Sequence, residues 1–146
     1  MNIFSAMEII SSGLTAQRTR LNITSSNLAN ANTTRTEEGG PYRRKDPVFT
    51  TEPMSLRFGE LLDDKLARQA QGVRTTEIVE DNSPPRMVHD PGHPDANAEG
   101  YVAYPNVSVV EEMVNMIMAA RAYEAGATAM QTVTSMAQAA LRIGGR

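Results

Sequence analysis

All eight prolines of this 146-residue chain lie between residues 33 and 106, and the same region holds 22 of the 31 charged residues. Residues 1–32 and 107–146 contain no proline and only three and six charged residues, respectively. Proline interrupts helices and charged side chains resist burial, so ends of this composition favour long helices with buried faces. We therefore expect an N-terminal assembly helix in residues 1–32, a charged β/loop arm or small module in residues 33–106, and a C-terminal assembly helix in residues 107–146.

The N-terminal pattern predicts a helix over residues 5–31, about 40 Å long at roughly 1.5 Å per residue. Ser5 and Glu8 fit a capping box, with Phe4 and Ile9 placed as a hydrophobic staple. Apolar residues recur every seven positions, with a second row that is apolar at first and then polar: Met7, Leu14, Leu21 and Leu28, and Ile3, Ile10, Gln17, Thr24 and Ala31. Gly13 and many Ser, Thr and Asn residues give this helix low intrinsic propensity, so we expect it to require a partner.

The C-terminal pattern predicts a longer helix that begins after Pro105, with Ser108 and Glu111 as a capping box and Gly144–Gly145 as the stop. Its seam alternates by four and three residues through ten positions: Val109, Met113, Met116, Ala120, Tyr123, Ala127, Met130, Thr134, Ala137 and Leu141. A seam of this length specifies a coiled-coil partner. The N-terminal helix has the same period, and an antiparallel or folded-back pair would place both chain ends in one layer.

Short strands with Gly, Pro and Asp turns are expected in the middle region, within residues 39–50, 72–80, 85–90 and 100–104. Residues 55–70 are compatible with a brief helix. Because few apolar residues occur here, the middle region can form only a small β module or an extended arm. The expected fold class is mainly α with a small β part, in which long terminal helices pair as a coiled coil.

The apolar character of the terminal helices extends beyond the predicted seam. Small or apolar residues flank it at Val110, Val114, Ile117 and Val133, and a chain this short offers no third long helix to cover them. Neighbouring subunits are the interpretation that we favour. The alternatives are a helix buried in a monomeric bundle, and a soluble coiled-coil export chaperone or adaptor with a single partner.

Catalytic, cofactor-binding and metal-binding motifs are not expected in this chain. Without cysteine it can form no disulfide, thiolate zinc site or thiol nucleophile. His89-Asp90-Pro91-Gly92-His93 is better explained as a rigid turn whose aspartate caps the backbone than as a metal site. Glu111 and Glu112 point about 100° apart on a helix, and first-turn carboxylates favoured by the helix dipole explain them better than an acid/base pair.

Composition also argues against several classes of partner. The net charge of −3, with no basic stripe, argues against nucleic-acid binding. No apolar run approaches the roughly 20 residues needed to span a bilayer, and the first residues lack the pattern of a cleaved secretory signal.

Several segments resemble one protein family. Residues 12–22, SGLTAQRTRLN, and 26–32, SNLANAN, resemble the N-terminal signature shared by flagellar rod and hook proteins. The segment GGPYRRKDPVF at residues 39–49, and residues 79–125 with DPGHP, GYVAYPNV and EMVNMI, resemble the C-type proximal-rod proteins within that family. The match covers about three quarters of the chain, in the same order.

The resemblance implies a structural, non-enzymatic subunit of the rod, in the periplasmic part of the flagellar basal body. It implies export by the flagellar type III system without a cleaved signal peptide, and terminal helices that surround an export channel in a shaft that transmits torque. The implied partners are copies of itself, other proximal and distal rod proteins, the adaptor that joins the rod to the membrane ring, and the export gate. We expect Asn27 and Asn30 to close the first helix or to bond neighbouring chains. The predicted subunit or helix interface comprises Met7, Ile10, Leu14, Leu21, Asn27, Leu28, Asn30, Val109, Met113, Met116, Ala120, Tyr123, Ala127, Met130 and Leu141.

Overall fold

The computed structural model describes residues 3–53 and 71–144. Along the chain the elements are α1 (Ile3–Ala29), β1 (Lys45–Pro53), β2 (Gln71–Glu80), β3 (Arg86–His89), β4 (Tyr101–Tyr104) and α3 (Val109–Gly144). The predicted fold class, two long terminal helices with a small antiparallel β part between them, is confirmed. All four expected strands are present, whereas the brief helix expected in residues 55–70 lies entirely outside the described residues.

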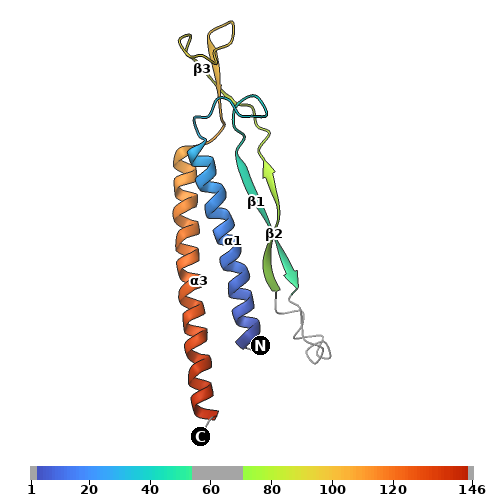
Figure 1. Cartoon of the computed structure of the whole chain (residues 1–146), viewed down its shortest axis with the longest axis vertical. Coiled ribbons are helices and arrows are strands. Elements are labelled where there is room, and N and C mark those ends of the chain that lie inside the picture. Colours follow the sequence, from blue (N-terminus) through green and yellow to red (C-terminus); the bar gives the residue numbers. More distant parts are fainter. Residues whose placement is uncertain (1–2, 54–70, 145–146) are drawn as a thin grey trace.

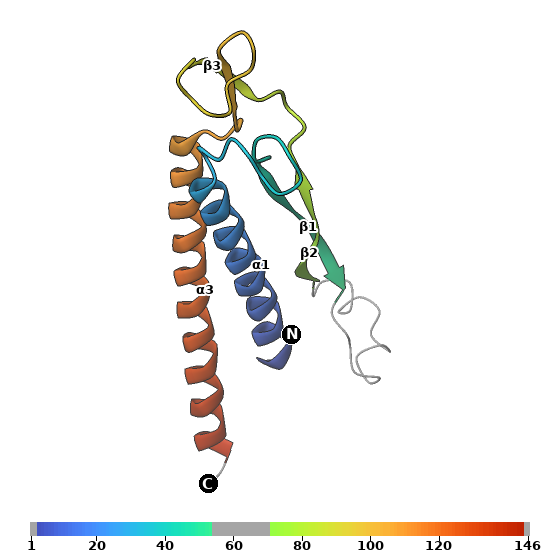
Figure 2. The same ribbon diagram turned by 45° about the horizontal axis from the view of Figure 1, so that its top comes forward.

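The two helices run side by side in opposite directions, with the start of α1 and the end of α3 at the same end of the molecule (Figures 1 and 2). Asn27 near the end of α1 bonds Glu112 near the start of α3, and Leu14 lies against Gly126 farther along. The expected antiparallel pair is therefore confirmed. A Cβ added at Gly126 would lie 2.9 Å from Leu14 Cδ2, so the glycine leaves room for the leucine where the helices meet.

The capping box predicted at the start of α3 agrees with the structure, whereas the one predicted at the start of α1 does not. Ser108 directly precedes α3, and its Oγ accepts a hydrogen bond from the Glu111 backbone N–H at 3.4 Å, as the C-terminal capping box predicts. At the N-terminus, α1 already includes Ile3, so Phe4 and Ser5 lie inside the first turn. The predicted capping box and hydrophobic staple at residues 4–9 are therefore wrong, because both require Ser5 to precede the helix.

The longer hairpin, β1–β2, lies along α1 (Figure 1) and pairs in antiparallel register from Lys45–Glu80 to Pro53–Gln71, with a register shift between Val48 and Phe49. A two-stranded hairpin is marginally stable alone and gains support by packing against a helix. Here Ser12 Oγ donates to Ile9 O at 2.7 Å and accepts from the Val73 backbone N–H at 3.1 Å. Gly72, buried beside Ser12, allows this close approach.

The shorter hairpin, β3–β4, forms a small lobe at the end of the molecule away from the start of α1 (Figure 1). In the turn after β3, the Gly92 backbone N–H donates to Asp90 Oδ1 at 3.3 Å, so the predicted aspartate-capped turn is confirmed. Thr34 Oγ1 donates to Asp95 Oδ2 at 2.8 Å and joins this lobe to the segment after α1.

Candidate functional site at the helix junction and the exposed face of the helix pair

Asn27 forms the centre of a buried polar network where α1, β1 and α3 meet. Its residue surface is 1 % exposed. The Nδ2 group donates to Lys45 O at 2.8 Å and to Glu112 Oε2 at 3.1 Å, while Oδ1 accepts from the Lys45 N–H and the Tyr42 hydroxyl, each at 2.9 Å. Asn27 therefore pairs with both backbone groups of the first residue of β1. The expectation that it closes α1 is corrected, whereas Asn30 Nδ2 does bond the Ser26 carbonyl in the last turn at 2.9 Å.

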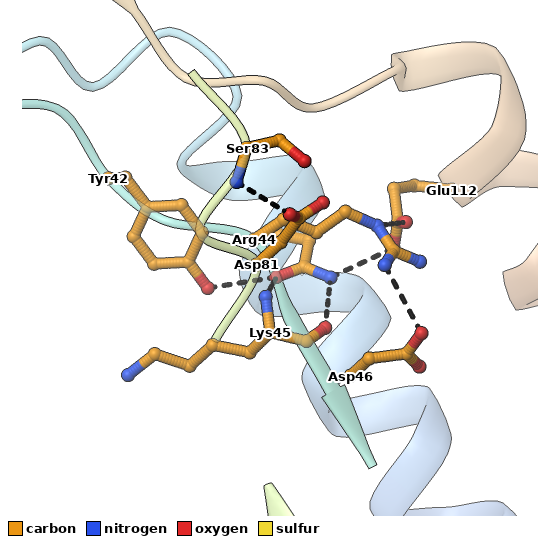
Figure 3. Close-up of polar contacts among 8 residues, drawn as sticks. Tyr42, Arg44, Lys45, Asp46, Asp81, Ser83 and Glu112 are labelled. Carbon is orange, nitrogen blue, oxygen red and sulfur yellow. Dashed lines mark hydrogen bonds and ion pairs between the residues drawn. The ribbon is translucent and has the colours of Figure 1, made fainter. Parts of the chain in front are cut away.

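Glu112 brings a negative charge into the same junction. It is 1 % exposed, and its Oε1 accepts a hydrogen bond from Arg44 Nε at 2.8 Å (Figure 3). Arg44 also reaches Asp46 through Nη1 at 3.2 Å. Burial alone would lower the pKa of Arg44, but the hydrogen bonds to Glu112 and Asp46, together with the negative charges of these two carboxylates, outweigh it, so the pKa lies above its ordinary value. Arg44 therefore remains cationic and compensates the buried carboxylate, which would otherwise be strongly destabilising.

This role of Glu112 differs from the predicted one. Glu112 does lie in the first turn of α3, where the helix dipole favours a carboxylate. Its side chain, however, turns inward to Asn27 and Arg44, while Glu111 stays exposed. The sequence patterns did not predict that Tyr42 and Arg44 would take part in this junction. The only sequence signal was their position in GGPYRRKDPVF immediately before a predicted strand.

The linker after β2 completes the junction. The Asp81 backbone N–H donates to Arg44 O at 2.8 Å and extends the β1–β2 pairing by one bond. Asp81 Oδ1 accepts from the Ser83 backbone N–H at 2.8 Å (Figure 3). Hydrogen bonds from Ser83, through its side chain and its backbone, lower the pKa of Asp81. The junction thus holds the start of β1, the end of β2 and both helices together.

Apart from Asn27 and Asn30, the predicted interface residues fall into two groups in the single chain. A half-buried group includes all of the predicted α1 leucines and the middle of the α3 seam: Met7, Ile10, Leu14, Leu21, Leu28, Met116, Ala120, Ala127 and Met130. An exposed group consists of Val109, Met113, Tyr123 and Leu141. In the first turns of α3 the predicted seam residue is Met113, but the buried residue is its neighbour Glu112. Farther along the helix, Ala119 is buried next to the half-buried seam residue Ala120.

An apolar face on α3 is left uncovered by the other parts of the chain that the structure describes. Val110 is 72 % exposed and Leu141 75 % exposed, and the other large apolar residues exposed on this helix are Val109, Met113, Val114, Ile117, Met118, Tyr123, Met136 and Ile143. Exposed apolar side chains that follow one another along a helix are a feature of interaction surfaces. Within the described residues, no helix is long and apolar enough to cross a membrane, and no cluster of three or more His, Asp or Glu side chains could hold a metal ion.

Both ends of the chain match known protein families. Residues 7–35 match the family described as flagella basal body rod protein, and residues 98–143 match the C-terminal family of the flagellar basal body rod FlgEFG proteins. These segments contain most of α1 and nearly all of α3, together with Asn27 and Glu112.

Full-length relatives carry the same description. The chain is 44 % identical to the flagellar basal-body rod protein FlgC of Borreliella burgdorferi, over 98 % of both chains. It is 41 % identical to FlgC of Bacillus subtilis and 38 % identical to FlgC of Salmonella typhimurium, over 99 % of both chains in each case.

Proposed function

This chain belongs to the flagellar basal-body rod proteins of the FlgC type, and from that membership we infer how its two terminal helices are used. It is a structural subunit of the rod and a component of the flagellar basal body. We propose that residues 1–32 and 107–146 form its assembly layer and that residues 33–106 form an arm outside that layer. The observation that carries this proposal is the apolar face of α3, which no other described element of the chain covers.

The proposed location is the periplasmic part of the rod, which the chain reaches through the flagellar type III system. The proposed partners are further copies of the chain and other proximal and distal rod proteins, together with the adaptor to the membrane ring and the export gate. A shaft built in this way transmits torque through many close helix contacts and surrounds the export channel. Its function is therefore structural rather than catalytic.

Subcellular fractionation tests the proposal. We expect the native protein to remain in detergent-resistant particles of high mass, extracted from the cell envelope together with hook and ring proteins. Recovery only in the soluble fraction of cells that bear complete flagella would contradict the rod assignment. In that case a stable one-to-one complex with another protein would favour the adaptor.

Two substitutions separate pairing within the chain from contacts between chains. Ala120→Glu places a carboxylate in the half-buried seam against α1, so we expect it to block incorporation while synthesis continues. Val114→Glu changes an exposed position, so we expect a helical chain that still fails to incorporate. Val114→Ile is the matched control, because it keeps the position apolar and β-branched. Normal motility with Val114→Glu would contradict the proposed surface, and normal motility with Ala120→Glu would contradict the seam.

A further inference from the structure

The apolar contacts between α1 and α3 do not by themselves define one alignment of the helices. Leu14, Leu21 and Leu28 repeat at seven-residue intervals, and the space at Gly126 accepts Leu14. An antiparallel slip of one heptad would bring Leu21 or Met7 to Gly126 instead. Either slip preserves an apolar seam, because heptad repeats are compatible with several registers.

The polar network at the junction has no equivalent one heptad away. A slip of seven residues displaces one helix by about 10 Å along its axis, far beyond hydrogen-bonding distance. In one direction Asn27 would face Ala119 or Ala120, which offer no polar side chain. In the other direction Asn27 would lie beyond the first residue of α3 and face no part of that helix. Arg20, seven residues before Asn27, would then be the cation nearest Glu112. Neither slip keeps the Asn27 bond to Glu112, so Arg44 could no longer join both helices to β1.

Chain connectivity does not exclude these slips. The segment from residue 30 to residue 108 separates the helices, and it contains two separate hairpins and several irregular stretches. Its first strand is fixed to the helix pair through Asn27, which bonds both backbone groups of Lys45, and through Arg44, which bonds Glu112. The same few contacts therefore position both helices and β1.

We propose that the Asn27–Glu112–Arg44 network sets the register of the α1–α3 pair and excludes alignments that differ by one heptad. Buried polar contacts are known to specify register in helix pairs even where they add little stability. Here the network fixes how far the end of α3, with Leu141 and Ile143, extends past the start of α1. This inference goes beyond the proposed rod function, because it concerns the alignment of the helices within one chain.

The absence of cysteine makes the register directly measurable. Three double-cysteine variants of the full chain are oxidised in intact cells: L14C/G126C for the native register, and L14C/A119C and L14C/V133C for the two slips. The probe is a thiol-reactive mass tag that counts unreacted cysteines in each chain. Because every pair replaces Leu14, its packing against Gly126 cannot bias the comparison. The readout does not depend on whether the chain reaches the basal body.

With the native network, we expect L14C/G126C to form a disulfide at least about tenfold more efficiently than either slipped pair, since either slip breaks the Asn27–Glu112 hydrogen bond and the link that Arg44 makes between the helices and β1. When Asn27→Leu and Glu112→Met are introduced, disulfides at L14C/A119C or L14C/V133C should rise to within about threefold of the native pair. Arg74→Met is the control, because it removes a pair with Glu52 inside the longer hairpin and should leave the pattern unchanged.

Exclusive formation of the L14C/G126C disulfide after both substitutions would overturn the proposal. If the doubly substituted chain does not accumulate, the single Asn27→Leu and Glu112→Met variants are measured in the same way. Loss of the native disulfide in both single variants, without a gain in either slipped pair, would also overturn it. The network would then be needed for folding and not for register.

Discussion

Gly13 in α1 and Gly126 in α3 provide a matched pair for measuring how closely the helices pack. A Cβ added at Gly13 would meet no described atom within 4 Å, whereas at Gly126 it would lie 2.9 Å from Leu14 Cδ2 and 3.4 Å from Leu14 Cγ. Replacing glycine by alanine inside a helix stabilises it by about 0.8–1.0 kcal/mol through backbone entropy and propensity. This gain applies at both positions, and only Gly126 carries a steric cost.

The cost at Gly126 falls on the end of a flexible side chain. Leu14 must leave its preferred rotamer, which costs about 0.5–1.5 kcal/mol, or the helices must separate slightly. We therefore expect Gly13→Ala to raise the free energy of unfolding by about 1 kcal/mol and Gly126→Ala to leave it nearly unchanged. With Leu14→Ala as the background, Gly126→Ala should recover the full gain of about 1 kcal/mol, giving a coupling of similar size between positions 14 and 126.

The assay is urea unfolding followed by far-UV circular dichroism, at one fixed concentration of a stabilising osmolyte for all variants. Comparison of slopes as well as midpoints shows whether a substitution also changes the surface exposed on unfolding. Equal stabilisation by Gly13→Ala and Gly126→Ala in the presence of Leu14 would refute the reasoning. The leucine would then not occupy the space that the glycine leaves.

Three further predictions concern single polar groups. Gln17 Oε1 is buried without a hydrogen-bond partner among the described residues. Gln17→Met should therefore raise the free energy of unfolding by on the order of 1 kcal/mol, which a higher melting temperature would show. A Cβ at Gly72 would lie 3.0 Å from Ser12 Oγ, which accepts the hydrogen bond of the Val73 backbone N–H. Gly72→Ala should therefore speed hydrogen exchange at the Val73 amide, and unchanged exchange would contradict this contact. The pKa of Asp81 is lowered from its ordinary 3.8, so its carboxylate stabilises the fold above that pH and loses this effect as pH falls through the lowered pKa. Asp81→Asn should therefore lower the melting temperature at neutral pH and match the parent in acid.

Local patterns predicted most of the fold. The start of α3 followed from Ser108 and Glu111, and the strands followed from turn residues that flank short apolar runs. The antiparallel pairing followed from two segments with the same period at opposite ends of one chain. Each of these predictions came from patterns of residues a few positions apart, which a single sequence displays directly.

The junction could not be predicted, because its partners are distant in the sequence. Glu112 is separated from Arg44 by 68 residues and from Asn27 by 85. A first-turn glutamate is also explained by the helix dipole, so no local anomaly indicated that Glu112 is buried. The error at Ser5 has the opposite origin: a capping pattern was present, but α1 already includes Ile3. Which exposed α3 residues contact other subunits remains a prediction.

The pairing of the first helix with the last has a kinetic consequence. Closing the large loop between Asn27 and Glu112 is slow compared with forming a hairpin, because its contacts join distant parts of the chain. The β1–β2 and β3–β4 hairpins have short sequence separations and can form first. If the chain emerges from a narrow passage with its N-terminus leading, α1 has no intramolecular partner until residues beyond 109 have followed. Helix pairing would then be the last folding step and would coincide with the arrival of the complete subunit.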